Sequence, residues 1–362
     1  MSKVTFQKSN TAFYSTLKSR VDEYFKSHHL EKTGNWELYT KTLILVPLAV
    51  GLFFSVLFFH DSLSVVASLG MCALLGLTLA SMGFNIMHDA CHGAYSKKDW
   101  VNELLGYSLN IMGGNAFIWK QKHNIIHHTY TNVDGVDDDI AKSPLIRQCY
   151  TQKWVPAHKW QHIYMFIVYA ISSFAWVFIM DFNKYLSRKI YRTKMWDVNR
   201  KEQIIFWVGK LYYLGVFILL PISIVGLKAW AIGFGVMHVT MGLSLALVFQ
   251  LAHVVEGAQF EEAYDDKHIE NDWAIHQVVT TANFAPKNLL VRWYVGGLNY
   301  QIEHHLFPKV SHVHYPAISQ IVKDVCKEYH INYNEFKTTR SAILSHIKMM
   351  KEFGDHPQPV AA

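Results

Sequence analysis

Histidine residues are concentrated in three short segments of this 362-residue chain, and their spacing suits the binding of metal ions. The segments are HDACH at 88–92, HNIIHH at 123–128 and QIEHH at 301–305. If each segment is helical, side chains four residues apart share a face, so each segment can direct at least two polar groups at one volume. The seven histidines are His88, His92, His123, His127, His128, His304 and His305.

The number and type of these side chains limit the kind of site. Imidazole nitrogen binds iron, zinc, copper and nickel, so histidine alone does not identify the ion. A structural zinc takes four ligands, so these histidines are too many for one such site and suit two ions. The Glu and Glu-x-x-His pattern of soluble di-iron bundles is absent. We therefore predict a histidine-rich site for two metal ions, with zinc-bound structural loops as the alternative.

The composition predicts that a membrane protein carries these segments. Hydrophobic residues make up 51% of the chain and charged residues 17%, whereas about 25% charged residues is usual in soluble domains. The net charge of +6 comes without an aromatic RNA-binding motif, so a nucleic-acid partner is not expected. Four apolar runs are each long enough to cross about 30 Å of hydrocarbon as helices. They are 43–59, 63–87, 204–225 and 229–252, joined by short polar breaks into two hairpins.

A fifth apolar run, 163–180, would make the number of membrane crossings between the histidine segments odd if it spanned the membrane. The histidine segments follow the first and the last hairpin, so an even number of crossings must separate them if they meet. Basic residues are frequent in 1–41 and in 181–203, and the positive-inside tendency places both segments in the cytoplasm. We therefore predict that 163–180 is re-entrant or lies in the membrane interface. Five full crossings are the alternative.

The predicted fold is an all-α integral membrane protein with four transmembrane helices, interfacial helices and a cytosolic helical cap that holds the histidine-rich site. The chain is expected to consist of six segments. They are a cytoplasmic N-terminal segment (1–41), a first transmembrane hairpin (42–92), a cap segment with the second histidine cluster (93–203), a second hairpin (204–253), a cap segment with the third cluster (254–350) and a frayed tail (351–362).

The three clusters together resemble the histidine boxes of the integral-membrane fatty acid desaturases. The resemblance extends from about residue 63 to 316 and includes NYQ at 299–301 and LFP at 306–308. The third box begins with a glutamine, Gln301, and in this it resembles the third box of the front-end subgroup. Enzymes of this subgroup insert a double bond between an existing one and the carboxyl end. The resemblance implies four spanning helices beneath a cytosolic cap with two ferrous ions.

By this resemblance the seven box histidines are iron ligands, and further residues join them. Gln301 stands where relatives with an all-histidine third box have a ligand, and His253 ends the last spanning run, from which relatives also draw a ligand. Neighbouring polar groups can bond the second nitrogen of a ligand imidazole, which orients the ring and raises its basicity. The residues predicted for this outer role are Asp89, Asp137, His276 and Glu303.

Several other polar groups have a simpler interpretation. The aspartates of 134–139 form a solvated acidic loop unless they orient ligand imidazoles. His238 lies inside a spanning run, and we expect it to be buried with its hydrogen bonds satisfied. His312 and His314 are expected at the surface or the membrane interface, and His158 is expected at the surface.

The predicted reaction introduces a cis double bond into the acyl chain of a lipid or acyl-CoA, with O2 and two electrons. No acid–base side chain can oxidise an unactivated methylene, so the metal supplies the oxidation and the protein supplies binding, orientation and exclusion of water. A fatty acyl or sphingolipid hydroxylase, acetylenase or ketolase of the same superfamily is the alternative. A membrane metal transporter is a third possibility, but its ligands should lie at mid-membrane depth, where only His238 qualifies.

The expected electron donor is a separate protein. The His-Pro-Gly-Gly haem motif of a fused cytochrome b5 does not occur in the sequence, so ferredoxin, or cytochrome b5 with its reductase, must deliver the electrons. The net charge of +6 favours a basic docking face for such an acidic carrier. The missing fused domain favours the bacterial inner membrane over the endoplasmic reticulum, with the active site facing the cytoplasm.

Overall fold

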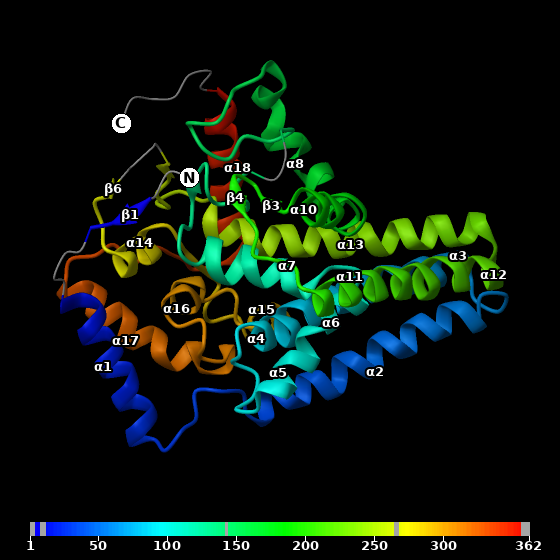
Figure 1. Cartoon of the computed structure of the whole chain (residues 1–362), viewed down its shortest axis with the longest axis horizontal. Coiled ribbons are helices and arrows are strands. Elements are labelled where there is room, and N and C mark those ends of the chain that lie inside the picture. Colours follow the sequence, from blue (N-terminus) through cyan, green and yellow to red (C-terminus); the bar gives the residue numbers. More distant parts are fainter. Residues whose placement is uncertain (1–3, 8–11, 142–143, 264–267, 356–362) are drawn as a thin grey trace.

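The computed structural model describes residues 4–7, 12–141, 144–263 and 268–355. These residues are mostly helical, and their strands are short pairs. Long helices run side by side toward one end of the molecule, at the right of Figure 1, and shorter helices gather at the other end. The predicted all-α fold is confirmed.

Among the described residues, four helices are long and apolar enough to cross a membrane. Two of them are continuous α-helices, and the other two contain a π-helical turn. They are α2 (Trp36–Phe58); α3 (Val65–Met82) with the π-turn η1 (Gly83–Met87) and α4 (His88–Cys91); α11 (Arg200–Tyr213) with the π-turn η5 (Leu214–Leu219) and α12 (Leu220–Val225); and α13 (Leu227–His253). The four spanning helices in two hairpins therefore match the prediction.

Polar caps and one glycine determine where these helices begin. The Asn35 side chain accepts a hydrogen bond from the backbone N–H of Glu37 at 2.9 Å, so α2 starts well before the apolar run and includes Lys41. Ser64 caps α3 in the same way. Gly226 separates α12 from α13 with φ of 79°, a conformation that costs little only for glycine.

The fifth apolar run lies in a bent helix pair, residues 156–187. Its two halves, Pro156–Ala170 and Ser172–Ser187, are inclined by 58°. The prediction that 163–180 is re-entrant or interfacial stays a prediction. The elements of the pair are η3 (Pro156–Trp160), α8 (Gln161–Ala170), α9 (Ser172–Ala175), the π-turn η4 (Trp176–Met180) and α10 (Asp181–Ser187).

The remaining helices form the cap at the opposite end from the hairpin turns (Figure 1). A buried apolar cluster lies between the spanning helices and continues into the cap, so one packed core supports both. The cap helices are α1 (Ala12–Ser27), α5 (Asp99–Gly106), α6 (Ser108–Ile111), α7 (Ala116–Lys120), the π-turn η2 (Gln121–His127), α14 (Trp273–Val279), α15 (Leu289–Tyr294), α16 (Gln301–Leu306), η6 (His312–His314), α17 (Tyr315–Glu328) and α18 (Thr339–Asp355).

Short strand pairs join cap segments that are distant in sequence. Three pairs are parallel and one is an antiparallel hairpin. The β2–β5 pair fixes the loop that follows the second histidine segment against the segment that follows α13. The pairs are β1 (Thr5–Phe6) with β6 (His268–Ile269), β2 (Val133–Asp134) with β5 (Glu261–Glu262), β3 (Lys189–Ile190) with β4 (Thr193–Lys194), and β7 (Asn283–Phe284) with β8 (Glu335–Phe336).

The C-terminal helix α18 corrects one predicted boundary. It continues to Asp355, so the prediction of a frayed tail from residue 351 is wrong for 351–355, and 356–362 lie outside the described residues. The helix is kept in place by His346, whose Nδ1–H donates to the carbonyl oxygen of Val254 at 2.6 Å and whose Nε2 accepts from the hydroxyl of Tyr169 at 2.9 Å.

Candidate metal centre

The three histidine segments meet inside the cap. The first follows the π-turn η1 at the end of the second spanning helix, the second lies in the π-turn η2, and the third forms α16. A π-turn adds a residue to the helical turn and re-aims side chains, and such turns are frequent at functional sites. All seven box histidines and His253 are buried, with exposed fractions between 0% and 7%.

Four imidazoles form a first group. They belong to His88, His92, His123 and His304, and one nitrogen of each lies within 4.8 Å of the others. The ring centroids of His88 and His304 are 4.5 Å apart, and those of His92 and His304 are 4.9 Å apart. Residues from all three boxes thus surround one volume.

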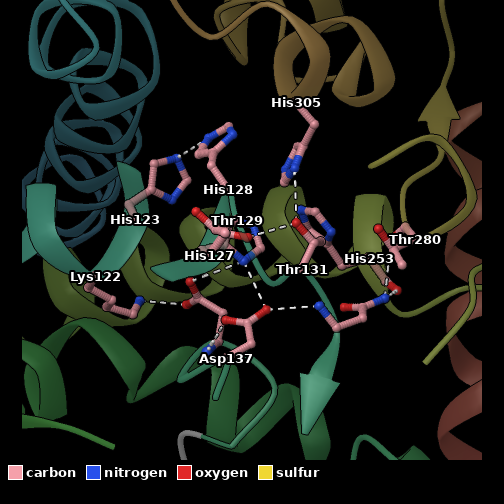
Figure 2. A network of polar contacts seen from close by, with 12 residues as sticks. Lys122, His123, His127, His128, Thr129, Thr131, Asp137, His253, Thr280 and His305 are labelled. Carbon is pink, nitrogen blue, oxygen red and sulfur yellow. Dashed lines mark hydrogen bonds and ion pairs between the residues drawn. The ribbon is translucent and has the colours of Figure 1, made fainter. Parts of the chain in front are cut away.

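A second group lies beside the first. It contains His127, His253 and His305, again with ligand atoms within 4.8 Å of one another. His128 lies between the two groups, with ring centroids 4.6 Å from His304 and 4.3 Å from His305. Figure 2 shows His127, His128, His253 and His305 with their rings turned toward a common region. The arrangement offers donor sets for two ions.

The distances between ring nitrogens fit shared metal ions. His123 Nε2 lies 3.3 Å from His88 Nε2 and 3.2 Å from His128 Nε2. With a metal–nitrogen bond of about 2.1 Å, neighbouring ligand nitrogens lie about 3.0–3.4 Å apart. The segments also hold buried ring nitrogens without a hydrogen-bond partner among the described residues, on His92, His127, His128 and His304. Since an unpaired buried polar atom costs about 1–3 kcal/mol, these atoms are consistent with metal ligation.

The protonation state of these rings also suits metal binding. Burial lowers the pKa of His92, His123 and His128 well below the ordinary value, and neighbouring imidazoles lower it further. The pKa values of His304 and His305 are lowered for the same reasons. The rings are therefore neutral at physiological pH, and each offers a lone pair.

Gln301 joins the second group through its side-chain amide. The amide Nε2 lies 3.0 Å from His253 Nε2 and 3.4 Å from His305 Nε2. Its Oε1 is buried and has no hydrogen-bond partner among the described residues. A half-turn of the amide would exchange nitrogen for oxygen and give the second group an oxygen ligand. The geometry thus places Gln301 beside His253. These are the two residues that the sequence predicted as additional ligands.

Hydrogen bonds from outside the two groups hold several rings in position. The Nδ1–H of His127 donates to Asp137 Oδ2 at 2.9 Å, and this carboxylate also accepts from the backbone N–H groups of Asn132 and Asp139. Figure 2 shows Asp137 directly below His127, with Lys122 at its side. Asp137, which the sequence predicted for an outer role, contacts a box histidine, and its 0% exposure rules out a solvated loop at this position.

Two partners of the box histidines were not found from the sequence. His305 Nδ1–H donates to Gln277 Oε1 at 2.8 Å, and His304 Nδ1 lies 3.0 Å from the hydroxyl of Tyr315. Thr131 bonds Gln277 as well and lies 3.2 Å from His305 Nδ1. Gln277 directly follows His276, which the sequence predicted for the outer role. The prediction therefore missed the bonded residue by one position.

Two of the other residues predicted for the outer role, His276 and Glu303, bond groups outside the three boxes. His276 Nε2–H donates to the backbone carbonyl of Thr131 at 2.9 Å. Glu303 accepts from Asn283 Nδ2 at 2.7 Å and from the Tyr333 hydroxyl at 2.8 Å. Burial raises the pKa of Glu303 to about 7, against the lowering effect of both bonds. His276 thus bonds the backbone after the second box, and Glu303 bonds side chains from outside the three boxes.

Asp89 belongs to a buried chain of polar groups. Its Oδ2 accepts from Ser311 Oγ at 2.6 Å and lies 3.0 Å from His312 Nδ1, while its Oδ1 lies 4.0 Å from His88 Nδ1. His312 in turn bonds Lys41 on α2, with Nζ and Nε2 3.0 Å apart. This carboxylate, which lies within the first box, thus contacts Ser311 and His312 and is linked through His312 to Lys41.

Three histidines expected at the surface are buried, so those predictions are wrong. His312 is 2% exposed and bonded as described, and His314 bonds the carbonyl of Thr33. His158 bonds the carbonyl of Pro144. His314 and His158 thus each bond a backbone carbonyl in a loop, whereas His312 bonds the Lys41 side chain. His238, expected to be buried and satisfied, bonds Ser173 and Tyr213.

A largely apolar cavity of about 560 Å³ reaches the first imidazole group and Gln301. At its inner end the lining contains His88, His123 and Gln301, and the ring of Trp119 stacks on His123 with a centroid distance of 4.3 Å. The rest of the lining comes from the spanning helices, the cap and the bent helix pair, and includes Leu79, Phe84, Leu109, Met112, Met241 and Leu245. A narrow apolar chain could therefore pass beside the imidazoles.

Apolar spanning helices, a buried set of imidazoles and an adjoining apolar cavity define an integral-membrane metalloenzyme that acts on a long apolar substrate. Residues 63–337 match the model of the family described as fatty acid desaturase, and the chain belongs to this family. The family and the histidine groups together support iron-dependent catalysis. Membership also sets aside the interpretation as a metal transporter.

Curated relatives extend over nearly the whole chain. An "sn-1 linoleoyl-lipid 6-desaturase" of Arthrospira platensis is 37% identical over 99% of this chain and 97% of its own length. A protein of the same name from Synechocystis sp. is 35% identical, over 94% of this chain and 95% of its own length. An "acyl-lipid (8-3)-desaturase" of Physcomitrium patens is 36% identical over 95% of this chain and 72% of its own length.

Proposed function

We propose that this protein is a front-end acyl-lipid desaturase, which places a cis double bond between an existing double bond and the carboxyl end of a membrane-lipid acyl chain. The observation that carries the proposal is the apolar cavity, whose inner end is formed by box residues His88, His123 and Gln301. The relatives named as linoleoyl-lipid 6-desaturases support a polyunsaturated chain and a position near the carboxyl end.

We assign the site to two irons. His88, His92, His123 and His304 would hold one, and His127, His253 and His305 the other, with His128 between them and Gln301 beside the second. Bound iron, with O2, two electrons and two protons, supplies the oxidation that converts two adjacent methylenes to an alkene and O2 to two molecules of water. The outer partners Asp137 and Gln277 fix which ring nitrogen faces the ion.

The protein's own contribution is position and exclusion of water. Trp119 covers the face of His123 and, at 9% exposure, closes the inner end of the cavity. Apolar side chains on either side hold the acyl chain against this wall. Because a displacement of about 1 Å at the reacting carbons can cost about a hundredfold in rate, the depth to which the chain enters decides which carbons react.

The proposed orientation places both ends of the described chain and the imidazole groups on the cytoplasmic side of a bacterial inner membrane. Basic residues on 184–201 support it. The proposed donor is ferredoxin or cytochrome b5, which would dock on the cytoplasmic side that carries the basic residues of 184–201. Turnover with limiting donor should then fall as ionic strength rises, because screening weakens the encounter. A rate independent of salt would remove the docking model.

The function is tested by expression in a host that contains linoleoyl lipids and no 6-desaturase. Mass spectrometry of derivatised fatty esters should show a product lighter by two hydrogen atoms, with the new double bond on the carboxyl side of the existing ones. A product heavier by one oxygen atom would identify a hydroxylase instead. His304→Ala should abolish the product and lower bound iron, whereas His28→Ala, at an exposed position, should leave both unchanged.

A further inference from the structure

The cavity has an outer end as well as an inner one. Lining residues at the surface include Leu145, Ile171, Ile179 and Asn183. The exposed fractions of the three apolar side chains are 55%, 48% and 52%. Leu145 comes from the loop after the second box, and the other three come from the bent helix pair. These four residues outline a mouth between the loop and the bent pair.

The side of this mouth that the bent pair forms lies beside the membrane-spanning helix α13. Its bend lies against Gly242, where an added Cβ would be only 2.7 Å from the carbonyl oxygen of Ala170. Gly242 is eleven residues before His253 on α13, so the bend lies about 16 Å along the helix axis from the imidazole groups, toward the hairpin turns. Ile171 is at the bend itself.

The outer face of the bent pair is suited to hydrocarbon. Large apolar side chains on it are exposed over its whole length, which for a protein in water would be unfavourable and in a bilayer is not. The face is continuous with the mouth, because Ile171 and Ile179 belong to both. The exposed residues are Ile163, Ile167, Ile171, Phe174, Ile179 and Leu186.

Another part of the cavity wall is polar. Lys184 Nζ pairs with Asp138 Oδ2 at 2.6 Å, and Lys122 Nζ pairs with Asp139 Oδ1. Both lysines and Asp139 line the cavity. Along the cavity wall, polar groups thus lie near the second box and apolar groups near the bend, which is the order of ester and hydrocarbon in a glycerolipid at a membrane surface.

We infer that the acyl chain enters sideways from the bilayer, through the mouth between Leu145 and the bent helix pair, while it is still esterified to a membrane glycerolipid. The inference rests on the proposed function and adds the route by which the acyl chain enters. The hydrocarbon passes Ile171 and Ile179 without crossing water, and the ester remains beside the Lys184–Asp138 pair. A water-soluble thioester would have no need of an apolar mouth at this depth.

The first test is independent of catalysis. Full-length protein in vesicles, without an electron donor, is irradiated with a phosphatidylglycerol whose sn-1 chain carries a diazirine at mid-chain. We expect cross-links to peptides that contain 144–148 and 171–184, and their loss in Ile179→Trp, which fills the mouth. Ile167→Trp is the matched control, because Ile167 is 67% exposed on the same pair and does not line the cavity. Equal labelling of Ile179→Trp would overturn the inference.

The second test measures turnover with donor present. Ile179→Trp should lower the rate on vesicle-borne acyl lipid by about tenfold or more, with iron content unchanged, while Ile167→Trp keeps the wild-type rate. Conversion of a soluble acyl-CoA, but not of the vesicle lipid, by wild-type protein would overturn lateral entry. If the wild-type protein forms no desaturated product from any substrate, the proposed function fails, and the cross-linking pattern still decides the route.

Discussion

The ammonium group of Lys41 on the first spanning helix lies 3.0 Å from Nε2 of His312, a residue that follows the third histidine box. Both side chains are buried, with exposed fractions of 1% and 2%. His312 then contacts Asp89, which is the neighbour of His88 in the first box. One polar chain therefore joins three segments far apart in sequence and sets the position of the first box.

Replacing His312, in the middle of this chain of polar groups, should destabilise the protein more than replacing Lys41 at its end. His312→Leu leaves Lys41 and Asp89 buried without their shared partner, and breaking such a buried network typically costs about 3–5 kcal/mol. Lys41→Met removes the charge together with its need for a partner and should cost less. We expect the thermal midpoint in detergent to fall more for His312→Leu than for Lys41→Met, with part of the loss recovered in the double variant. An unaltered midpoint in His312→Leu would contradict this role.

The bond between Asp137 and His127 predicts a specific loss of metal affinity. Asp137→Asn removes the negative charge that holds the Nδ1–H of His127, so the ring becomes less basic and less well oriented. Outer partners of this kind are worth about 10–100-fold in metal affinity. Competition between the protein and a calibrated chelator for iron measures the effect. Asp197→Asn, at an exposed position, is the control, and equal affinities in the two variants would refute the prediction.

The spanning helices and the box histidines could be predicted from sequence because their signals are local. Apolar runs such as 204–225 are unmistakable in a chain of otherwise mixed polarity, and the His-x-x-x-His spacing is recognisable in a single segment. The bounds of the helices were less accurate, because the cap at Asn35 extends α2 beyond the apolar run. The prediction also assumed α-helical boxes, whereas residues 121–127 form a π-turn.

The partners of the box histidines could not be predicted, because no feature of the neighbouring sequence indicates them. Gln277 and Tyr315 are ordinary polar residues that reach the site only when α14 and α17 pack against α16. His312 was predicted at the surface or the membrane interface. Its burial depends on Lys41, which is 271 positions away in the chain.

Gly242 should be necessary for the bend of the helix pair. An added Cβ would lie 2.7 Å from the Ala170 carbonyl oxygen and 3.0 Å from the Ser173 nitrogen, which are both backbone atoms with little freedom to move. We expect Gly242→Ala to cost about 1–3 kcal/mol through overpacking and to lower turnover, because the pair lines the cavity. Gly235→Ala on the same helix meets no atom within 4 Å and should be neutral. Equal thermal midpoints and rates for the two variants would show that the contact is not needed.

His346 should make the protein sensitive to acid. Burial lowers its pKa from 6.5 to about 4, so between these values the unfolded chain binds a proton that the folded chain does not. The stabilisation is complete above pH 6.5 and is lost as the pH falls toward 4. At one pKa unit per about 1.4 kcal/mol, the loss from this residue at pH 5 is about 2 kcal/mol.

His346→Gln isolates this contribution from that of the other buried histidines. A glutamine amide can donate to the Val254 carbonyl and accept from the Tyr169 hydroxyl, as the imidazole does, but it takes up no proton. We therefore expect the thermal midpoint of the variant to fall less than that of the wild-type protein between pH 7.5 and pH 5, measured in the same detergent. Since every other titrating group is common to both proteins, parallel pH profiles would mean that His346 keeps an ordinary pKa in the folded state.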